Sequence, residues 1–245
     1  MFVNYTHKYK KRGKWIFEPN DDCERRSVRI LDFFERIKFP DYFYHYQSGG
    51  HVVALHEHLK NDCFFKIDIQ NFFYSIARNR VTRAFRAYGL KGAPTFAKWS
   101  CVRSPYPAGP RYVVPIGFRQ SPLVASLVLM QSPVAAAIEK ARSNGIVVSV
   151  YLDDFIGSHS DEAALTEAYN DILTACEEAN LLPNAGKLTA PAKTIIAFNC
   201  NVTKGKASVT EERIAEFYSK PPKSALSASS FEDYVGRVAE ANSAL

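Results

Sequence analysis

The pattern of hydrophobic and polar residues predicts an alternation of helices and short strands. Residues 23–38 repeat apolar positions at helical spacing, and residues 121–143 have the length and composition of a largely buried helix. Residues 63–70 instead alternate with the period of two that a strand shows. The remaining predicted elements are hairpins at residues 5–19, 145–160 and 193–210, helices at 51–59, 75–88 and 160–180, a loop at 89–111, and short helices after 210. This order predicts an α+β fold around a small, mainly antiparallel sheet.

Two of these strands present carboxylates on their polar faces. In residues 63–70, Asp68 lies on the face opposite the apolar side chains. In the hairpin at 145–160, the same alternation puts Asp153 on the face of Tyr151 and leaves Asp154 at the tip. If the two strands are neighbours, the carboxylates of Asp68 and Asp153 converge across about one strand spacing of 4.8 Å. The alternative is that the Asp-Asp pair forms an ordinary solvated turn.

Two ionised carboxylates at this distance need a cation between them, because burying charge without a positive partner is costly. Mg²⁺ takes oxygen ligands and is usually held by one or two carboxylates together with substrate phosphates. Two such ions, about 3.5–4 Å apart, stabilise the attacking and leaving oxygens of a phosphoryl displacement. The carboxylates therefore predict a site for two Mg²⁺ ions, with Mn²⁺ as a substitute.

The composition favours a folded domain with a nucleic-acid partner. With 245 residues, 47% of them hydrophobic, the chain can bury a substantial core. The net charge of +6 is uneven, with basic runs in the first thirty residues and arginines at positions 78, 80, 83 and 86. A basic chain with 13% aromatic residues fits nucleic-acid binding, whereas a single basic run is more often a solvated face. No apolar window has the length of a membrane span and no apolar signal segment is present, so we expect a cytoplasmic protein without a membrane partner.

The spacing of cysteines and histidines does not indicate a metal centre. The five cysteines are widely separated and lack a Cys-x-x-Cys pair, so we expect reduced core thiols in preference to a zinc site or disulfides. His51, His56 and His58 cluster, but no cysteine or acidic set at ligand spacing accompanies them. We interpret them as ordinary helix or loop histidines.

Three motifs resemble those of reverse transcriptases in order and spacing. They are DIQNFFYSI from Asp68, GFRQSPLVASL around Gln120, and YLDD at residues 151–154. The resemblance runs from about residue 9 to about residue 210 and implies the fingers and palm of a right-hand polymerase, with the thumb very short or absent. It implies fingers at residues 1–65, a palm at 66–210 with a finger-type insertion around 78–115, and a short helical thumb remnant or connector at 211–245.

The resemblance also implies catalytic residues, position by position. Asp68 matches the first metal-binding acid, and Asp153 and Asp154 match the Tyr-x-Asp-Asp pair. Lys187 resembles the lysine that protonates the departing pyrophosphate, with Lys193 as an alternative and an ordinary solvated lysine as another. The expected metal-binding set is Asp68, Ile69, Asp153 and Asp154.

Contacts to nucleotide and nucleic acid are implied in the same way. Phe73 stands five residues after Asp68, where the family places an aromatic side chain that excludes a 2′-hydroxyl; the alternative is a core phenylalanine. Gln120 matches the glutamine beside the incoming nucleotide and template. The segment KKRGKWIFEP resembles the fingers hairpin that contacts the triphosphate, with a solvated basic turn as the alternative. The expected nucleotide-binding residues are Lys11, Lys14, Phe73, Gln120 and Tyr151, and the expected nucleic-acid-binding residues are Lys10, Arg12, Arg25 and Arg119.

The chain departs from the family pattern in two places. Gln120 is followed directly by Ser121 and Pro122, without the usual intervening glycine, and Arg119 replaces the customary proline. About 35 residues follow the hairpin at 193–210, so we expect no thumb of normal size and no RNase H or endonuclease domain. An oligomeric partner, a structured RNA, or a helical pair formed by residues 211–218 and 231–241 would then hold the duplex.

Compact bacterial reverse transcriptases of the retron-like and phage-defence groups show similar variation in the middle motif, and the chain resembles them most. This implies an RNA-directed DNA polymerase that adds dNTPs to a 3′ end, copies RNA into DNA, and acts in antiviral defence with a non-coding RNA, a second copy or a partner protein. Template-independent or protein-primed DNA synthesis is one alternative, which the product sequence made without template RNA would distinguish. A catalytically silent nucleic-acid-binding subunit is the other, which would bind without incorporating nucleotides.

Overall fold

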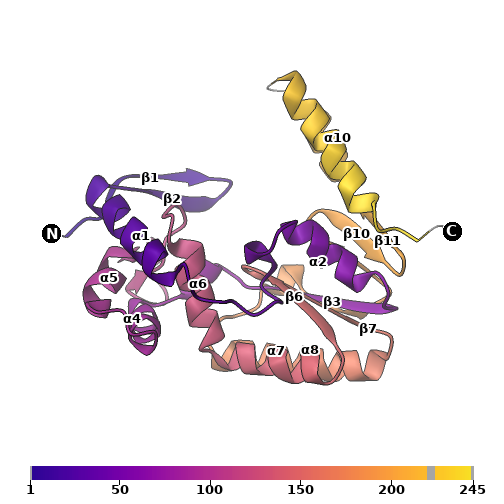
Figure 1. Cartoon of the computed structure of the whole chain (residues 1–245), viewed down its shortest axis with the longest axis horizontal. Coiled ribbons are helices and arrows are strands. Elements are labelled where there is room, and N and C mark those ends of the chain that lie inside the picture. Colours follow the sequence, from indigo (N-terminus) through magenta and orange to yellow (C-terminus); the bar gives the residue numbers. More distant parts are fainter. Residues whose placement is uncertain (1, 220–223, 244–245) are drawn as a thin grey trace. The chain divides into compact units, whose positions relative to one another are not determined.

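The computed structural model describes residues 2–219 and 224–243, and these residues form the predicted mixture of helices and antiparallel sheets (Figure 1). The chain divides into two compact units. Unit 1 comprises Met1–Lys38, Ile69–Ala136 and Ala175–Leu182, and unit 2 comprises Phe39–Asp68, Ala137–Thr174 and Pro183–Leu245. The division into fingers, palm and thumb remnant stays a prediction.

Unit 1 contains the predicted N-terminal hairpin and a group of helices. Its elements are β1 (Tyr5–Lys11), β2 (Lys14–Pro19), α1 (Asp21–Phe34), α3 (Phe72–Ser75), α4 (Arg78–Ala87), α5 (Ala93–Trp99), β4 (Val102–Arg103), β5 (Tyr112–Val113) and α6 (Ser121–Met130). The hairpin turns at Arg12 and Gly13, whose φ angles of 49° and 78° suit a tight two-residue turn. α1 begins where the side chain of Asn20 accepts a hydrogen bond from the Cys23 amide at 2.9 Å.

The helix predicted over residues 121–143 is two helices, α6 and α7 (Pro133–Ser143), whose axes are bent by 67°. Pro133 explains the break, because proline lacks an amide hydrogen and disfavours a helical conformation in the residue before it. Within residues 2–219 and 224–243, no single helix is long and apolar enough to cross a membrane; α6 and α7 reach that length and composition only as a bent pair.

The segment predicted as a loop at residues 89–111 contains the helix α5. Gly92 precedes this helix with a φ of 77°, and Pro94 lies in its first turn, where proline is tolerated. The helix predicted at 75–88 is observed as α4, and the short helix α3 that precedes it was not predicted. Gly92 and Pro94 therefore mark the start of α5, although the many glycines and prolines of this segment suggested that it contains no helix.

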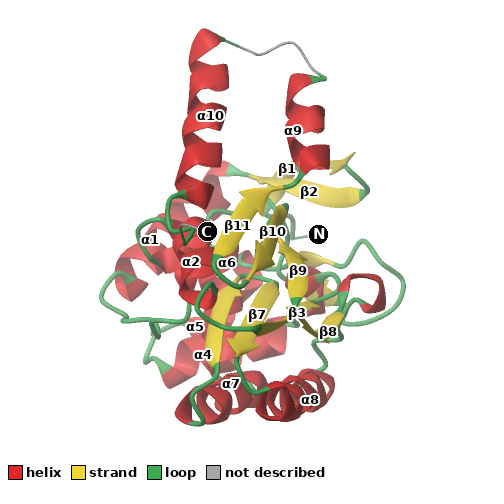
Figure 2. Ribbon diagram, turned by 90° about the vertical axis from the view of Figure 1, so that its right-hand side faces the viewer, coloured by secondary structure: helices red, strands yellow, loops and turns green. Residues whose placement is uncertain are grey.

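Unit 2 is built on a four-stranded antiparallel sheet in the order β6-β7-β3-β8. The strands are β3 (Cys63–Asp68), β6 (Val147–Tyr151), β7 (Asp154–His159) and β8 (Thr189–Ala192), the last not predicted. α8 (Glu162–Glu178) covers one face, where the rings of Phe65 and Tyr169 are 5.3 Å apart. In Figure 2, α7 and α8 lie side by side below this sheet, and Lys140 pairs with Asp171 at 2.7 Å.

The opposite face of the sheet carries its polar residues and packs against α2 (Gly50–His58). His58 is fully buried there, between the hydroxyl groups of Ser158 at 2.7 Å and Ser149 at 2.8 Å. Burial lowers the pKa of His58 to about 3, because the charged imidazolium would lose its hydration. His58 is therefore neutral at pH 7 and joins α2 to both β6 and β7.

A second, three-stranded sheet has the order β11-β10-β9. Its strands are β9 (Thr194–Ala197), β10 (Cys200–Thr203) and β11 (Lys206–Val209), so the predicted hairpin at 193–210 has a third strand. α9 (Glu211–Tyr218) and α10 (Ala225–Ala239) follow, and the rings of Phe217 and Phe231 stack at 3.9 Å between centroids. Val238 of α10, Val202 of β10 and Leu55 of α2 belong to one buried apolar cluster.

All five cysteines are buried free thiols, which confirms the prediction of reduced core residues. Burial raises their pKa values; that of Cys23 is about 11. Such thiols are poor nucleophiles at neutral pH, so none of them is a candidate for the chemistry of the chain.

Candidate active site

The pairing of β3 with β7 decides which carboxylates face each other. Asp68 at the end of β3 is directly opposite Asp154 at the start of β7. Residues directly opposite in an antiparallel pair project from the same face of the sheet, so Asp68 and Asp154 share the polar face. The expectation that Asp154 sits at the tip is wrong, because β6 ends at Tyr151 and the tip is formed by Leu152 and Asp153. The expected approach of Asp153 to Asp68 across the metals stays a prediction.

The turn at Leu152 and Asp153 is held by unusual local geometry. Leu152 has a φ of 57°, in the left-handed region that a branched side chain rarely adopts. Its amide donates a hydrogen bond to His45 Nδ1 at 3.3 Å. Burial lowers the pKa of His45 to about 4, so its ring is neutral and this nitrogen can accept. A neutral histidine therefore stabilises the strained turn that places Asp153 between the two strands.

Asp68 is fixed by partners that come from one short segment. It is 4% exposed, and Lys187 Nζ lies 2.9 Å from its Oδ2. The Asn184 side chain donates to its Oδ1 at 3.2 Å, and the Asn184 amide donates to its backbone carbonyl at 2.7 Å. Asn184 also caps the short helix η2 (Ala185–Lys187), where its side chain accepts from the Gly186 amide. This cap aims Lys187 back at the end of β3.

The ammonium group of Lys187 lies within electrostatic range of all three predicted acids. Its hydrogen bond to Asp68 raises the pKa of Lys187, and the negative charges of Asp68, Asp154 and Asp153 act in the same direction. The structure thus brings the predicted catalytic residues Asp68, Asp153, Asp154 and Lys187 together within unit 2. Asn184, which sequence reasoning missed, precedes the predicted lysine by three residues in NAGKLT, and asparagine there is a typical helix cap.

Asp154 is the least satisfied of the three acids. Its Oδ1 lies 3.3 Å from Lys66 Nζ, close enough for an ion pair but without hydrogen-bond geometry, and this buried oxygen has no hydrogen-bond donor among the described residues. Burial raises the pKa of Asp154, an effect that Lys66 opposes and the charge of Asp68 reinforces. Lys66 stands two residues before Asp68, on the polar face that the strand alternation identified.

This donor set fits a hard divalent cation. The buried, unsatisfied oxygen of Asp154 and the oxygens of Asp68 lie on one face of the sheet, and carboxylate oxygens are the ligands that Mg²⁺ prefers. Ile69 is buried and apolar, so it can contribute only its backbone carbonyl. In the part of the chain that the structure describes, no three side chains of His, Cys, Asp or Glu already form a closed metal-binding group.

Aromatic side chains surround Tyr151, the predicted nucleotide-binding residue next to the acids. Its ring centroid is 5.9 Å from that of His51 on α2 and 5.5 Å from that of Phe198 in the β9–β10 turn. His51 Nε2 in turn lies 3.3 Å from the hydroxyl of Tyr234 on α10. Sequence reasoning missed these three neighbours, because nothing in their local sequence indicates that α2, the turn and α10 meet.

The other predicted nucleotide-binding residues lie in unit 1, so their position relative to the carboxylates stays a prediction. Gln120 is fully buried and accepts a hydrogen bond from the Ser27 hydroxyl at 2.6 Å. Phe73 is half-buried beside Phe72. Lys11 and Lys14 face each other at the end of the β1–β2 hairpin.

The predicted nucleic-acid-binding residues lie in unit 1 as well. Arg12 is in the hairpin turn, and Lys10 Nζ lies 5.2 Å from the centre of the Trp15 ring. Arg25 is paired with Asp22 at 2.6 Å, and Arg119 with Glu24 at 3.7 Å. Both pairs are largely exposed and therefore weak, so the two guanidinium groups remain able to exchange partners.

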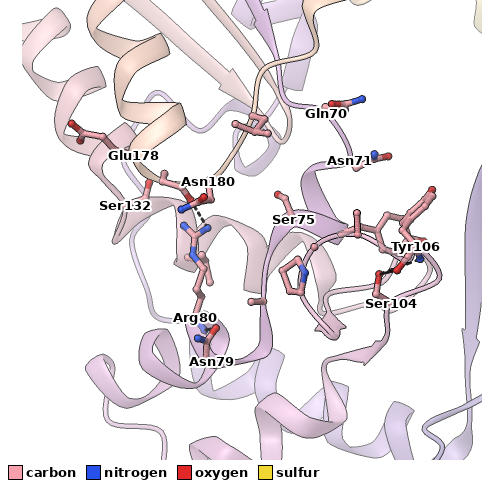
Figure 3. A pocket seen from close by; sticks show the side chains of 18 of the residues that line it. Gln70, Asn71, Ser75, Asn79, Arg80, Ser104, Tyr106, Ser132, Glu178 and Asn180 are labelled. Atoms are coloured by element: carbon pink, nitrogen blue, oxygen red, sulfur yellow. Dashed lines mark hydrogen bonds between the residues drawn. The ribbon is translucent and has the colours of Figure 1, made fainter.

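Unit 1 also contains a cavity of about 1180 Å³ that the sequence did not reveal (Figure 3). Gln70 and Asn71, directly after Asp68 and Ile69 in the chain, line it together with Ser75, Tyr74 and Tyr106. Figure 3 shows Arg80 extending towards Asn180, and its guanidinium donates to the Ala179 carbonyl at 2.8 Å. The lining of the cavity combines amide, hydroxyl and guanidinium groups with aromatic rings.

One family model matches the chain, and solved structures share its fold. The model of the family "Reverse transcriptase (RNA-dependent DNA polymerase)" matches residues 25–202. A telomerase structure from Candida albicans, in complex with a fragment of telomeric RNA, superposes with a TM-score of 0.54 at 9% identity and covers 77% of this chain and 38% of that one. A foamy viral protease-reverse transcriptase in complex with double-stranded DNA gives 0.50 at 16% identity, covering 91% and 33%. At these identities the likeness concerns the fold alone, and no curated protein matches in sequence.

Proposed function

Because the chain belongs to the reverse transcriptase family, we propose that it is an RNA-directed DNA polymerase that adds deoxynucleotides to the 3′ end of a primer. The observation that carries this proposal is the convergence of three carboxylates and one ammonium group at the ends of β3, β6 and β7. A domain that only bound nucleic acid would gain nothing from carboxylates gathered on one face, because they repel phosphates.

We propose Mg²⁺ as the cofactor, as two ions, with Mn²⁺ as a substitute. Asp68, Asp153, Asp154 and the Ile69 carbonyl would hold it, and the unsatisfied oxygen of Asp154 supports this assignment. When bound, the metal supplies positive charge that activates the primer hydroxyl and neutralises the departing pyrophosphate.

The residues of the chain have distinct parts in this proposal. The three carboxylates act as ligands and not as nucleophiles, so they do not form covalent intermediates with the substrate. Lys66 compensates the charge of Asp154 while leaving that oxygen without a hydrogen bond. Lys187 stays protonated because it faces the carboxylates, and it donates its proton to the leaving pyrophosphate. In phosphoryl transfer most of the catalysis is positioning and electrostatic stabilisation.

Substitution of the acids tests the proposal. Asp154→Asn and Asp153→Asn should each lower incorporation of a labelled dNTP on an RNA template with a DNA primer by at least about 10²-fold, the effect of losing one preorganised charge contact. Glu167→Gln, which removes an exposed carboxylate of α8, is the matched control and should keep wild-type activity. Circular dichroism should show the same fold in all three variants. Near wild-type incorporation by both Asp variants would refute the metal assignment.

A second candidate function is DNA synthesis without an ordinary template. It is favoured by Gln120, whose side chain is buried and bonded to Ser27 instead of being open to a nucleotide and template, and by the missing glycine after it. Sequencing the product made without added RNA separates the two: a product of defined sequence only with RNA supports templated synthesis. Binding of primer–template without incorporation, at any divalent metal, would favour the silent subunit instead.

We also propose a role in antiviral defence, supported by the resemblance of the middle motif to compact bacterial members of the family. Phages should form fewer plaques on bacteria that express the chain than on bacteria that express the Asp154→Asn variant. Equal plaque numbers would contradict this role and leave the polymerase proposal unaffected.

A further inference from the structure

The surface of unit 1 contains a groove whose charged lining residues are all positive. The groove has a volume of about 860 Å³ and lies between α4, α5 and the start of β5. Tyr112, Asn79 and Thr82 contribute to its lining, and none of its lining residues is acidic. Its five cationic residues are Arg78, Arg83, Arg86, Lys98 and Arg111.

What distinguishes these five cations is that they gather around one hollow that no acidic residue lines. Within the described ranges, no carboxylate lies within 4 Å of any of them. Arg25, Lys140 and Arg142, by contrast, are each paired with an aspartate. Five like charges around one hollow repel each other, and a bound polyanion would relieve that repulsion.

Aromatic rings hold several of these cations in place. The guanidinium carbon of Arg78 lies 4.2 Å from the centre of the Tyr112 ring, and that of Arg111 lies 5.5 Å from the same centre. Lys98 Nζ lies 4.1 Å from the centre of the Phe2 ring. These contacts orient the charges without neutralising them, so the groove keeps its full positive potential.

The residues of α4 that line the groove are different from those that pack into the core. The buried residues of α4 are Val81, Ala84 and Phe85, whereas Arg83 and Arg86 are exposed. Arg83 and Asn79 also line the neighbouring cavity of Figure 3, so the two hollows adjoin. The exposed Arg83 and Arg86 therefore do not contribute to the packing of α4. The positive surface extends from the groove into the neighbouring cavity.

We propose that this groove binds the phosphodiester backbone of single-stranded RNA. A small anion would neutralise one or two of the cations, whereas a strand that carries one phosphate per nucleotide can contact cations on α4, on α5 and at Arg111 directly before β5. Under the proposed function, the strand that is unpaired before synthesis is RNA, and the choice of RNA over DNA rests on that function. The groove is a binding site in addition to the carboxylate site, and no step of the chemistry takes place in it.

Fluorescence anisotropy with a labelled 20-nucleotide single-stranded RNA tests the proposal in EDTA, without dNTPs or metal. The double variant Arg83→Ala/Arg86→Ala should bind about 25-fold more weakly at 0.1 M salt, because each single-strand phosphate contact contributes about 0.7 decades there. The slope of log K against log salt should fall by about 1.4. The charge-preserving variant Arg83→Lys/Arg86→Lys should stay within about threefold of wild type, because Lys also binds phosphate as a point charge.

The matched control is Arg36→Ala/Lys38→Ala, which removes two exposed cations of unit 1 outside the groove. An equal loss of affinity in the control, or no loss in Arg83→Ala/Arg86→Ala, would overturn the proposal. Poly-glutamate of equal charge should displace the RNA poorly; if it displaces RNA as well as unlabelled RNA does, the groove fits an acidic protein segment instead. Affinity loss confined to single-stranded DNA of the same sequence would overturn the choice of RNA.

Failure of this proposal and failure of the proposed function are distinguishable. Asp154→Asn should keep wild-type RNA affinity in EDTA while losing incorporation, and Arg83→Ala/Arg86→Ala should keep incorporation on a primer–template with a one-nucleotide overhang. Loss of incorporation on that short substrate would show that the arginines serve the active site and would overturn a separate binding groove.

Discussion

The register of β3 against β7 determines which acid faces Asp68, and Gly157 provides a direct test of it. Gly157 is opposite Phe65 in the same ladder that sets Asp154 opposite Asp68. A Cβ atom added at Gly157 would lie 2.2 Å from the Phe65 ring, which is fully buried and packed against Tyr169. The φ of Gly157 is not in the left-handed region, so Gly157→Ala introduces no backbone strain.

The magnitude follows from two opposing effects. Inserting a methyl group against a ring that cannot move aside costs about 1–3 kcal/mol. Replacing glycine by alanine reduces the entropy of the unfolded chain, which returns about 0.4–1 kcal/mol. We therefore expect Gly157→Ala to lower the free energy of unfolding by about 1–2 kcal/mol. Phe65→Leu vacates the positions that the methyl group would meet, so the double variant should lose at least about 1 kcal/mol less than the sum of the single losses.

Urea unfolding followed by far-UV circular dichroism measures these differences. With an m value of about 3 kcal/mol/M, a loss of 2 kcal/mol lowers the midpoint by about 0.7 M. Gly236→Ala in α10 is the control, since a Cβ there has open space, and we expect it to raise stability by up to about 1 kcal/mol. Additive losses for Gly157→Ala and Phe65→Leu, or no loss for Gly157→Ala, would show that the register is shifted and would refute the pairing of Asp68 with Asp154.

Three further outcomes test individual side chains. Lys187→Ala should lower the rate of incorporation by about 10²-fold or more. The hydrogen bond to Asp68 raises the pKa of Lys187 above its usual 10.5, so the wild type should keep its proton donor at alkaline pH. Single-turnover rates with identical pH profiles in the wild type and in Lys187→Ala would contradict this role. His58 has a folded-state pKa of about 3 and an unfolded value near 6.5, so its contribution to stability is complete above pH 6.5 and is lost as the pH falls towards 3, by about 1.4 kcal/mol per pH unit. Urea midpoints between pH 7 and 4 should therefore fall more steeply in the wild type than in His58→Gln, and equal slopes would contradict the assignment. Phe73→Val should raise incorporation of ribonucleotides relative to deoxynucleotides by at least about tenfold, and an unchanged ratio in competition assays would indicate a core phenylalanine.

Strand alternation predicted the faces of unit 2 well and failed at the turn. The polar face of β3, with Lys66 and Asp68, and the polar face of β6, with Ser149 and Tyr151, are as the period of two predicts. Alternation holds only while the backbone stays extended, and Leu152 leaves the extended region with a φ of 57°. Leucine is not among the residues typical of such turns. The sequence therefore could not indicate that β6 ends at Tyr151 and that Asp154 is the residue paired with Asp68 in the ladder.

Contacts between distant segments lay beyond sequence reasoning. The hydrogen bond from Asn184 to Asp68 joins residues 116 positions apart, and the hydrogen bonds of His58 to Ser149 and Ser158 span 91 and 100 positions. Such contacts depend on the packing of several elements at once, which neither periodicity nor local propensity records. The division of unit 1 into short helices was partly readable, since Pro133 marks the break between α6 and α7, whereas the basic groove needed α4, α5 and β5 in one place.

The position of β3 and β7 in their sheet has a consequence for how the site behaves from one turnover to the next. Both strands are central, each paired on two sides, and Asp68 and Asp154 stand at their ends. Fixing the backbone of a residue costs about 1–2 kcal/mol of conformational entropy. For Asp68 and Asp154 this loss occurs when the sheet forms during folding. Amide hydrogens of these strands should exchange with solvent only when the sheet itself opens. Under the proposed function, Asp68 and Asp154 would therefore need no reordering between nucleotide additions, and the arrival of nucleotide and the movement of nucleic acid would set the duration of each cycle.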